Sequence, residues 1–133
     1  MTAEVEYLDV EDLIDLATAL LDDPPPLRDA GLLAAAAARP LAAAFGADVY
    51  PDRCTKAAAL LDSVVNNHAL IDGNKRLGWL ATAVFLELND VSSTRASNDD
   101  IYDLVMEVGA HHHSVEEIAG RLQRLMAPGR PDR

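Results

Sequence analysis

The chain has 133 residues, of which 50% are hydrophobic, and a formal net charge of −11 at pH 7. A chain of this length is expected to form one domain that buries roughly two-thirds of the surface of its unfolded form. The negative charge argues against DNA or RNA as a partner, because nucleic-acid binding relies on clustered lysine and arginine. No stretch of about 18 apolar residues lacks a charged residue, so we expect no membrane span.

The first residues are acidic and lack a basic region before an apolar run, so we expect no secretory signal. Cys54 is the only cysteine, which leaves no partner for a disulfide within the chain. This cysteine usage fits a reducing, cytoplasmic location. We interpret Cys54 as a structural thiol.

The N-terminal third of the chain predicts two helices. The first begins at Val10 with Asp9 as its cap, and the sequence DDPPP ends it because proline cannot continue a helix. Its apolar face is formed by Leu13, Ile14, Ala17, Leu20 and Leu21. A short alanine-rich helix is predicted over residues 31–39. Residues 39–52 have no helical period, and we expect an exposed loop or a short hairpin there.

The middle of the chain predicts two helices joined by a turn. Apolar residues from Ala57 to Val65 follow helical spacing, and His68 falls at the next step of this face. We therefore expect His68 to end the helix on its inner side. The sequence DGN then favours a turn, and the next helix starts near Asn74. That helix is almost wholly apolar up to Leu88, which indicates the buried centre of the domain.

Two further helices complete the pattern. The apolar face of one is formed by Ile101, Leu104, Val105 and Val108, and that of the other by Val115, Ile118, Leu122, Leu125 and Met126. Ser114 and Glu117 form a capping box ahead of the last helix. The sequence therefore predicts an all-α bundle of about six helices over residues 1–127. Residues 128–133 are expected to be a flexible tail.

The nine residues HALIDGNKR, from His68 to Arg76, bring together the groups that phosphate chemistry requires. The start of a helix binds anions through its free N–H groups and the positive end of its dipole. Gly73 allows an anion to approach the backbone, and Asn74 can cap the helix or donate its amide. Lys75 and Arg76 add positive charge at the same place.

Two more residues of this stretch complete the chemistry. Asp72 is an oxygen ligand that suits Mg²⁺, and the imidazole of His68 can accept a proton from a hydroxyl group. Each part of the stretch also has a simpler interpretation. His68 could be a core histidine, DGN could be a plain turn, and Lys75 and Arg76 could be solvated surface residues. Because all of them crowd at one end of one helix, we favour the functional interpretation.

HALIDGNKR also resembles the signature of the Fic/Doc family, His-x-Phe-x-(Asp/Glu)-(Gly/Ala)-Asn-x-Arg. A lysine before the arginine is the form found in the Doc (death on curing) branch. The resemblance covers roughly residues 27–90 and implies a compact bundle of about six helices. It implies that His68 is the general base and that Asp72 binds Mg²⁺. The residues it assigns to the phosphates of ATP are Gly73, Asn74, Lys75 and Arg76.

The resemblance also implies a function. Doc proteins are toxins of type II toxin–antitoxin systems that phosphorylate a threonine of elongation factor Tu, and a Phd-type antitoxin neutralises them. Other Fic proteins transfer AMP and have glycine where Lys75 stands. Residues 39–52 would correspond to the family's flap, which pairs with an extended segment of the target. AMP transfer and a non-catalytic module that only binds a partner remain alternatives.

The sequence departs from the family pattern at two places. Leu70 replaces the usual phenylalanine but is still an apolar anchor for the loop. Gly78 follows Leu77 where the branch often has Thr-Ala, and glycine inside a helix costs about 0.5–1 kcal/mol relative to alanine. We expect it to make room for Trp79 or for a neighbouring helix. The three histidines at 111–113 predict a helix end rather than a zinc or nickel site, because consecutive histidines do not easily face one point.

Overall fold

The protein is described by a computed structural model, in which residues 4–127 form six α-helices, one turn of 3-10 helix and one short hairpin. The helices are α1 (Val10–Leu20), α2 (Ala30–Ala38), α3 (Arg53–Asn66), α4 (Asn74–Leu88), α5 (Asn98–Ala110) and α6 (Val115–Met126). The 3-10 helix spans Arg39–Leu41, and the antiparallel strands are β1 (Ala43–Ala44) and β2 (Ala47–Asp48). The predicted all-α fold with a short hairpin is confirmed. The predicted tail at 128–133 lies outside the described residues.

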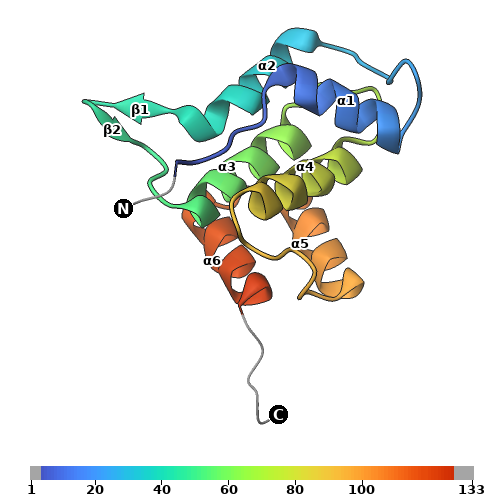
Figure 1. Cartoon of the computed structure of the whole chain (residues 1–133). Coiled ribbons are helices and arrows are strands. Elements are labelled where there is room, and N and C mark those ends of the chain that lie inside the picture. Colours follow the sequence, from blue (N-terminus) through green and yellow to red (C-terminus); the bar gives the residue numbers. More distant parts are fainter. Residues whose placement is uncertain (1–3, 128–133) are drawn as a thin grey trace.

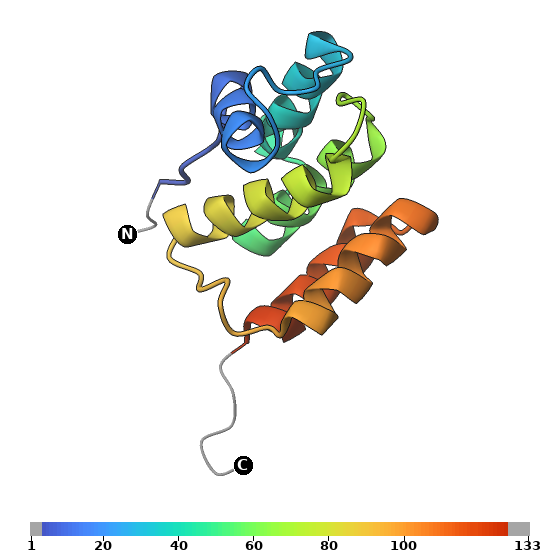
Figure 2. The ribbon, with the colours of Figure 1, turned by 90° about the vertical axis from the view of Figure 1, so that its right-hand side faces the viewer.

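The helices form three layers (Figures 1 and 2). The pair α3 and α4 lies in the middle, with α1 and α2 on one side and α5 and α6 on the other. The loop between α3 and α4 carries the HALIDGNKR sequence, so it belongs to the central layer. Within residues 4–127, no helix is both long and apolar enough to cross a membrane.

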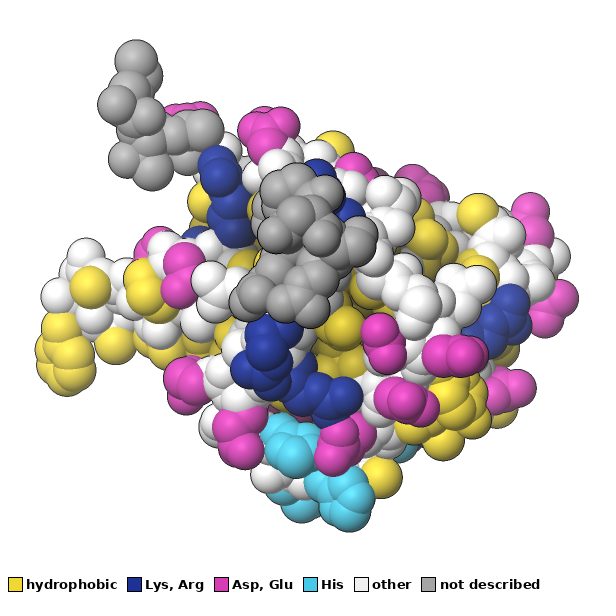
Figure 3. Space-filling view, turned by 90° about the horizontal axis from the view of Figure 1, so that it is seen from below, with side chains coloured by type: hydrophobic (Ala, Val, Ile, Leu, Met, Phe, Trp, Pro, Cys, Tyr) yellow, Lys and Arg dark blue, Asp and Glu magenta, His cyan; other side chains and the backbone are white. Residues whose placement is uncertain are grey.

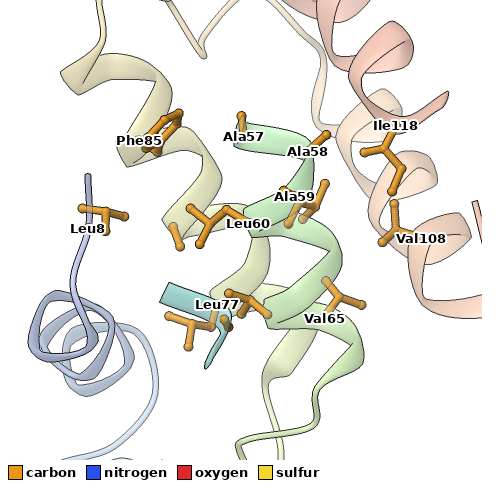
Figure 4. Close-up of a cluster of buried hydrophobic side chains, with 14 of the residues drawn as sticks. Leu8, Ala57, Ala58, Ala59, Leu60, Val65, Leu77, Phe85, Val108 and Ile118 are labelled. Carbon is orange, nitrogen blue, oxygen red and sulfur yellow. The ribbon is translucent and has the colours of Figure 1, made fainter. Parts of the chain in front are cut away.

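The most buried helix is α3, not α4 as predicted. Nine of the 14 residues of α3 are buried, against six of the 15 residues of α4. The small side chains at 57–59 let neighbouring helices approach α3 closely, while Leu60 packs toward Leu77 and Phe85 of α4 (Figure 4). In contrast, α4 leaves Trp79 half-buried and Leu88 49% exposed. The apolar composition of α4 predicted full burial, but an apolar helix can also border an open groove.

Polar residues at the helix starts explain where the helices begin. Asp9 and Ser114 each form the predicted cap, and both caps are reciprocal capping boxes. A third box joins Asp52 to Thr55 and starts α3 four residues before the apolar face at Ala57. This box was not predicted from the sequence, and it places the first turn of α3 next to the hairpin.

The close contact of α3 and α4 depends on Gly78. A Cβ atom at this position would lie 2.7 Å from Cγ2 of Val65, which is shorter than any ordinary contact. Of the two roles predicted for Gly78, the structure therefore confirms room for a neighbouring helix. Any larger residue would push α3 and α4 apart.

The hairpin and the 3-10 turn before it are attached to α3 through a buried lysine and a half-buried arginine. Lys56 is 1% exposed, and its Nζ atom donates to the carbonyl of Pro40 at 3.4 Å and to Oδ2 of Asp48 at 3.1 Å. Nζ also lies 5.6 Å from the ring centroid of Tyr7. Burial alone would lower the pKa of Lys56, but its contacts with Tyr7 and Asp48 outweigh burial and raise the pKa. Lys56 therefore stays charged and fixes the base of the hairpin.

Arg39 makes a second attachment farther along α3, in its second half. It donates to Oδ2 of Asp62 at 2.6 Å, to the hydroxyl of Ser63 at 2.9 Å and to that of Tyr50 at 3.1 Å. Beyond these attachments the hairpin projects from the body of the molecule with apolar side chains at its tip (Figure 3). The tip residue, Phe45, is fully exposed.

Candidate active site

The HALIDGNKR sequence lies at the end of α3 that is opposite the hairpin. The hairpin precedes Arg53, the first residue of α3, whereas the loop follows Asn66, the last. A helix of 14 residues is about 21 Å long. The predicted hairpin is present, but the fold therefore separates it from the loop by the length of this helix (Figure 1).

His68 does not end α3 on its inner face, and this prediction is wrong. The helix ends at Asn66, and Asn67 caps it by donating its N–H to the carbonyl of Ser63. The side chain of Asn67 also donates to the carbonyl of Leu32 at 3.2 Å, which turns the chain out of the helix. His68 then takes a left-handed conformation with φ of 53° and is exposed. Its imidazole is at the surface, where a substrate can reach it.

A segment that begins at the last of the prolines after α1 holds this loop. Residues 26–29 run antiparallel to residues 68–71, with Leu27 bridged to Leu70. The N–H groups of residues 28 and 29 both donate to the carbonyl of Ala69, at 2.8 and 3.0 Å, and that of Ile71 donates to Pro26 at 2.8 Å. Leu70 is 2% exposed, which confirms that it anchors the loop in place of phenylalanine.

The same segment supplies a side chain to the loop. The guanidinium of Arg28 donates to the backbone carbonyl of His68 through Nε, at 2.8 Å, and through one terminal nitrogen. Arg28 is exposed and lies 40 residues before His68. Local sequence patterns do not reveal such a contact.

Asn74 and Gly73 shape the turn before α4. Asn74 is the first residue of the helix, and Gly73 precedes it as the cap, so of the two roles left open for Asn74 the structure does not show the cap. The amide of Asn74 instead accepts from the N–H of Leu70 and donates to its carbonyl, both at 3.0 Å. Gly73 has φ of 89°, and a Cβ atom there would lie 2.7 Å from Cδ1 of Leu21. Only glycine fits this position.

The charged residues of the turn are exposed. Asp72 accepts the N–H of Gly73 at 2.9 Å through Oδ1. A carboxylate offers about four acceptor positions, so this bond leaves it able to bind a cation. Mg²⁺ is commonly bound through one carboxylate together with phosphate oxygens, and the donor set fits this ion.

Lys75 and Arg76 occupy the first turn of α4, which carries no acidic residue. By contrast, the first turns of α1, α5 and α6 each carry two acidic residues, the charge that normally stabilises a helix start. Lys75 lies against α5, where a Cβ atom on Gly109 would be 2.9 Å from its Cε. The reversed charge at α4 favours an anion at this helix end.

These residues border one pocket of about 220 Å³. Its lining residues are Val65, His68, Ile71, Asp72, Gly73, Asn74, Lys75 and Arg76. The structure thus brings every predicted site residue to a common pocket. Their chemical roles remain predictions.

A larger groove adjoins the pocket and shares Lys75 and Arg76 with it. It has a volume of about 520 Å³ and is lined largely by apolar side chains from the end of α1, from α4 and from α5. Trp79 lines it together with Tyr102 and Met106, which are 63% and 40% exposed. This groove explains why α4 is not buried on all sides.

The three histidines follow the end of α5, as predicted (Figure 3). His111 caps the helix by donating its N–H to the carbonyl of Glu107. The ring of His113 faces carboxylates rather than carbonyls, with Glu107 and Glu117 each at 3.7 Å. Among residues 4–127 no group of three or more histidine, cysteine, aspartate or glutamate side chains is placed so that it could hold a metal ion. At Cys54, burial first and the nearby Asp52 second raise the pKa of the thiol, which is consistent with an unreactive cysteine.

The histidine-bearing loop and the cationic start of α4 lie within a segment that matches a known protein family. The family model for the Fic/DOC family matches residues 7–86. The chain belongs to the Fic/Doc family. The Toxin Doc of Mycolicibacterium smegmatis is 43% identical to it over 123 residues, which make up 92% of this chain and 95% of that protein.

Proposed function

We propose that this protein is the toxin of a type II toxin–antitoxin system and transfers the terminal phosphate of ATP to a protein hydroxyl. The observation that carries the proposal is the single pocket in which His68, Asp72 and the cationic start of α4 meet. The name of the relative, Toxin Doc, supports a toxin. Membership of the Fic/Doc family supports a transferase that acts on proteins.

The imidazole, the carboxylate and the two cations of the pocket have separate tasks in this reaction. His68 accepts the proton of the attacking hydroxyl, whose oxygen bonds to the terminal phosphorus while the bond from that phosphorus to ADP breaks. Lys75, Arg76 and the N–H groups of the first turn of α4 hold the phosphates. Asp72 would hold Mg²⁺, and the ion would supply positive charge to offset that of the phosphates.

The proposed target is a threonine of elongation factor Tu, and phosphorylation would arrest translation in the cytoplasm. The test is to incubate the protein with elongation factor Tu, ATP and Mg²⁺ and to measure the intact mass of the target. Addition of one phosphate is expected. Addition of AMP would replace the kinase proposal with the alternative of an AMP transferase.

A thermal-shift assay separates catalysis from a module that only binds a partner. An ATP-dependent enzyme is stabilised by ATP and Mg²⁺, because a ligand that binds only the folded state raises its stability. A module without nucleotide chemistry would show no shift. His68→Ala is the matched control, because it should keep the shift while losing transfer.

We propose the apolar groove beside the pocket as the site of a Phd-type antitoxin. Its lining suits the apolar face of an amphipathic helix, and Lys75 and Arg76 at its edge suit acidic residues on that helix. A disordered antitoxin segment would fold on binding there. Expression of the toxin alone should arrest growth, and normal growth with folded, soluble protein would contradict the proposal.

A charge placed in the groove tests the antitoxin site. Met106→Glu should keep toxicity but prevent neutralisation by the antitoxin, because the groove would no longer accept an apolar face. Leu88→Glu is the control, since Leu88 is similarly exposed at 49% but is not part of the groove lining. Equal neutralisation of both variants would place the antitoxin elsewhere.

A further inference from the structure

Arg28 contacts the backbone of the proposed general base although it lies outside the HALIDGNKR sequence. Its Nε donates to the His68 carbonyl at 2.8 Å, and a terminal nitrogen donates to the same oxygen. We infer that Arg28 is a positioning residue, which fixes the backbone of His68 so that the imidazole points at the attacking hydroxyl. This inference rests on the proposed phosphate transfer.

His68 needs such support because of its conformation. Its φ of 53° lies in the left-handed region, which residues with a side chain rarely adopt. The direction of the imidazole depends on this backbone, because the allowed rotamers change with φ and ψ. Two hydrogen bonds from a charged, planar guanidinium to one carbonyl fix the orientation of that peptide group.

The support is separate from the rest of the loop. The backbone N–H of Arg28 donates to Ala69 and does not depend on its side chain. Leu70 is held independently by the amide of Asn74. Since the side chain of Arg28 is exposed, its removal should leave the core and the pairing of the two segments intact.

The expected consequence is a selective loss of turnover. A displacement of about 1 Å in a reacting group can reduce the rate about 100-fold. We expect Arg28→Ala to lower kcat by about 10- to 100-fold and to change the KM for ATP by less than about twofold. Arg28→Lys should recover part of the loss, because its ammonium can still donate to the carbonyl but without the planar pair of donors.

The kinetic test compares these variants with Arg95→Ala, the removal of an exposed arginine between α4 and α5. The control should keep the wild-type kcat, and all variants should keep the wild-type melting temperature. Adding Arg28→Ala to His68→Ala should cause no further loss, because the residue that Arg28 positions is gone. A wild-type kcat in Arg28→Ala, or an increase in KM alone, would overturn the inference. So would a further loss in the double variant.

A measurement without turnover separates this inference from the proposed function. The ¹³C shifts of the backbone at residues 68 and 69 report the left-handed conformation, and amide exchange reports how firmly the loop is held. Arg28→Ala should alter both at these residues and leave the helices unchanged. Unaltered shifts would overturn the positioning role even if the wild type transferred no phosphate. Altered shifts would support it in that same case.

Discussion

The charged residues at the two ends of α3 differ in burial and in their contacts. At the hairpin end Lys56 is buried and bonded to Asp48 and to the carbonyl of Pro40. At the loop end His68, Asp72 and the two cations of α4 are exposed around a pocket. A charge satisfied by groups of the same chain stabilises the fold, whereas charges left at a pocket are free to meet a ligand. Substitutions at the two ends should therefore change different quantities.

The largest effect is expected from His68→Ala at the loop end. Loss of a general base lowers kcat by about 10²- to 10⁴-fold. Because His68 is exposed, the free energy of unfolding should change by less than about 0.5 kcal/mol, and ATP binding should persist. Kinetics beside chemical denaturation measure both quantities. Wild-type turnover would show that His68 is not the base.

Removal of the cation at the start of α4 should have the next largest effect. A hydrogen bond to a charged group contributes about 1.5–3 kcal/mol, so Lys75→Gly should lower phosphate transfer by about 10- to 100-fold. The glycine would also open the turn to the nucleotide position that AMP-transferring relatives use. The mass added to the target distinguishes phosphate from AMP. Lys75→Ala removes the charge without the backbone freedom of glycine and is the matched control.

The hairpin end should respond in stability instead. Lys56→Ala removes both the buried stem and the bonds to the hairpin, and we expect it to lower the free energy of unfolding by about 1–3 kcal/mol. The KM for ATP should stay within about twofold of the wild type. Denaturant unfolding and kinetics check the two halves of this prediction. A large change in KM with little change in stability would show that the two ends of α3 are not independent.

The smallest effect is expected at the tip of the hairpin. Phe45 is fully exposed, so Phe45→Ser should change the free energy of unfolding by less than about 0.5 kcal/mol. The hairpin lies one helix length from the loop, so we also expect the KM for the protein target to stay unchanged. A raised KM for the target with an unchanged KM for ATP would instead assign the hairpin the role of the family's flap.

Much of the fold could be predicted from local patterns. The apolar spacing located the helices, and capping residues such as Asp9 and Ser114 marked their starts. Periodicity could not locate the end of α3, because the side chain of Asn67 turns the chain by bonding to Leu32, 35 residues away. Nor could composition show that α4 borders a groove, since that depends on how α1 and α5 pack beside it.

The sequence predicted the residues of the candidate site but not the residue that contacts its loop from outside. His68, Asp72 and the residues of the α4 turn are contiguous, and so their meeting at one pocket follows from the chain. Arg28 reaches the loop only through tertiary structure. Lys56 carried a weak signal, because it directly precedes the alanines of the most buried stretch of α3. A charged residue in such a position predicts a buried partner.

The pairing of residues 26–29 with residues 68–71 also has a consequence for folding. Closing a loop of about 40 residues carries an entropic cost, and contacts far apart in sequence slow folding. On a ribosome Arg28 emerges long before His68, and the site is complete only after α3 has emerged and folded back. An unfinished chain therefore has no assembled site. Local detachment of the upstream segment would likewise disable the finished protein without unfolding its core.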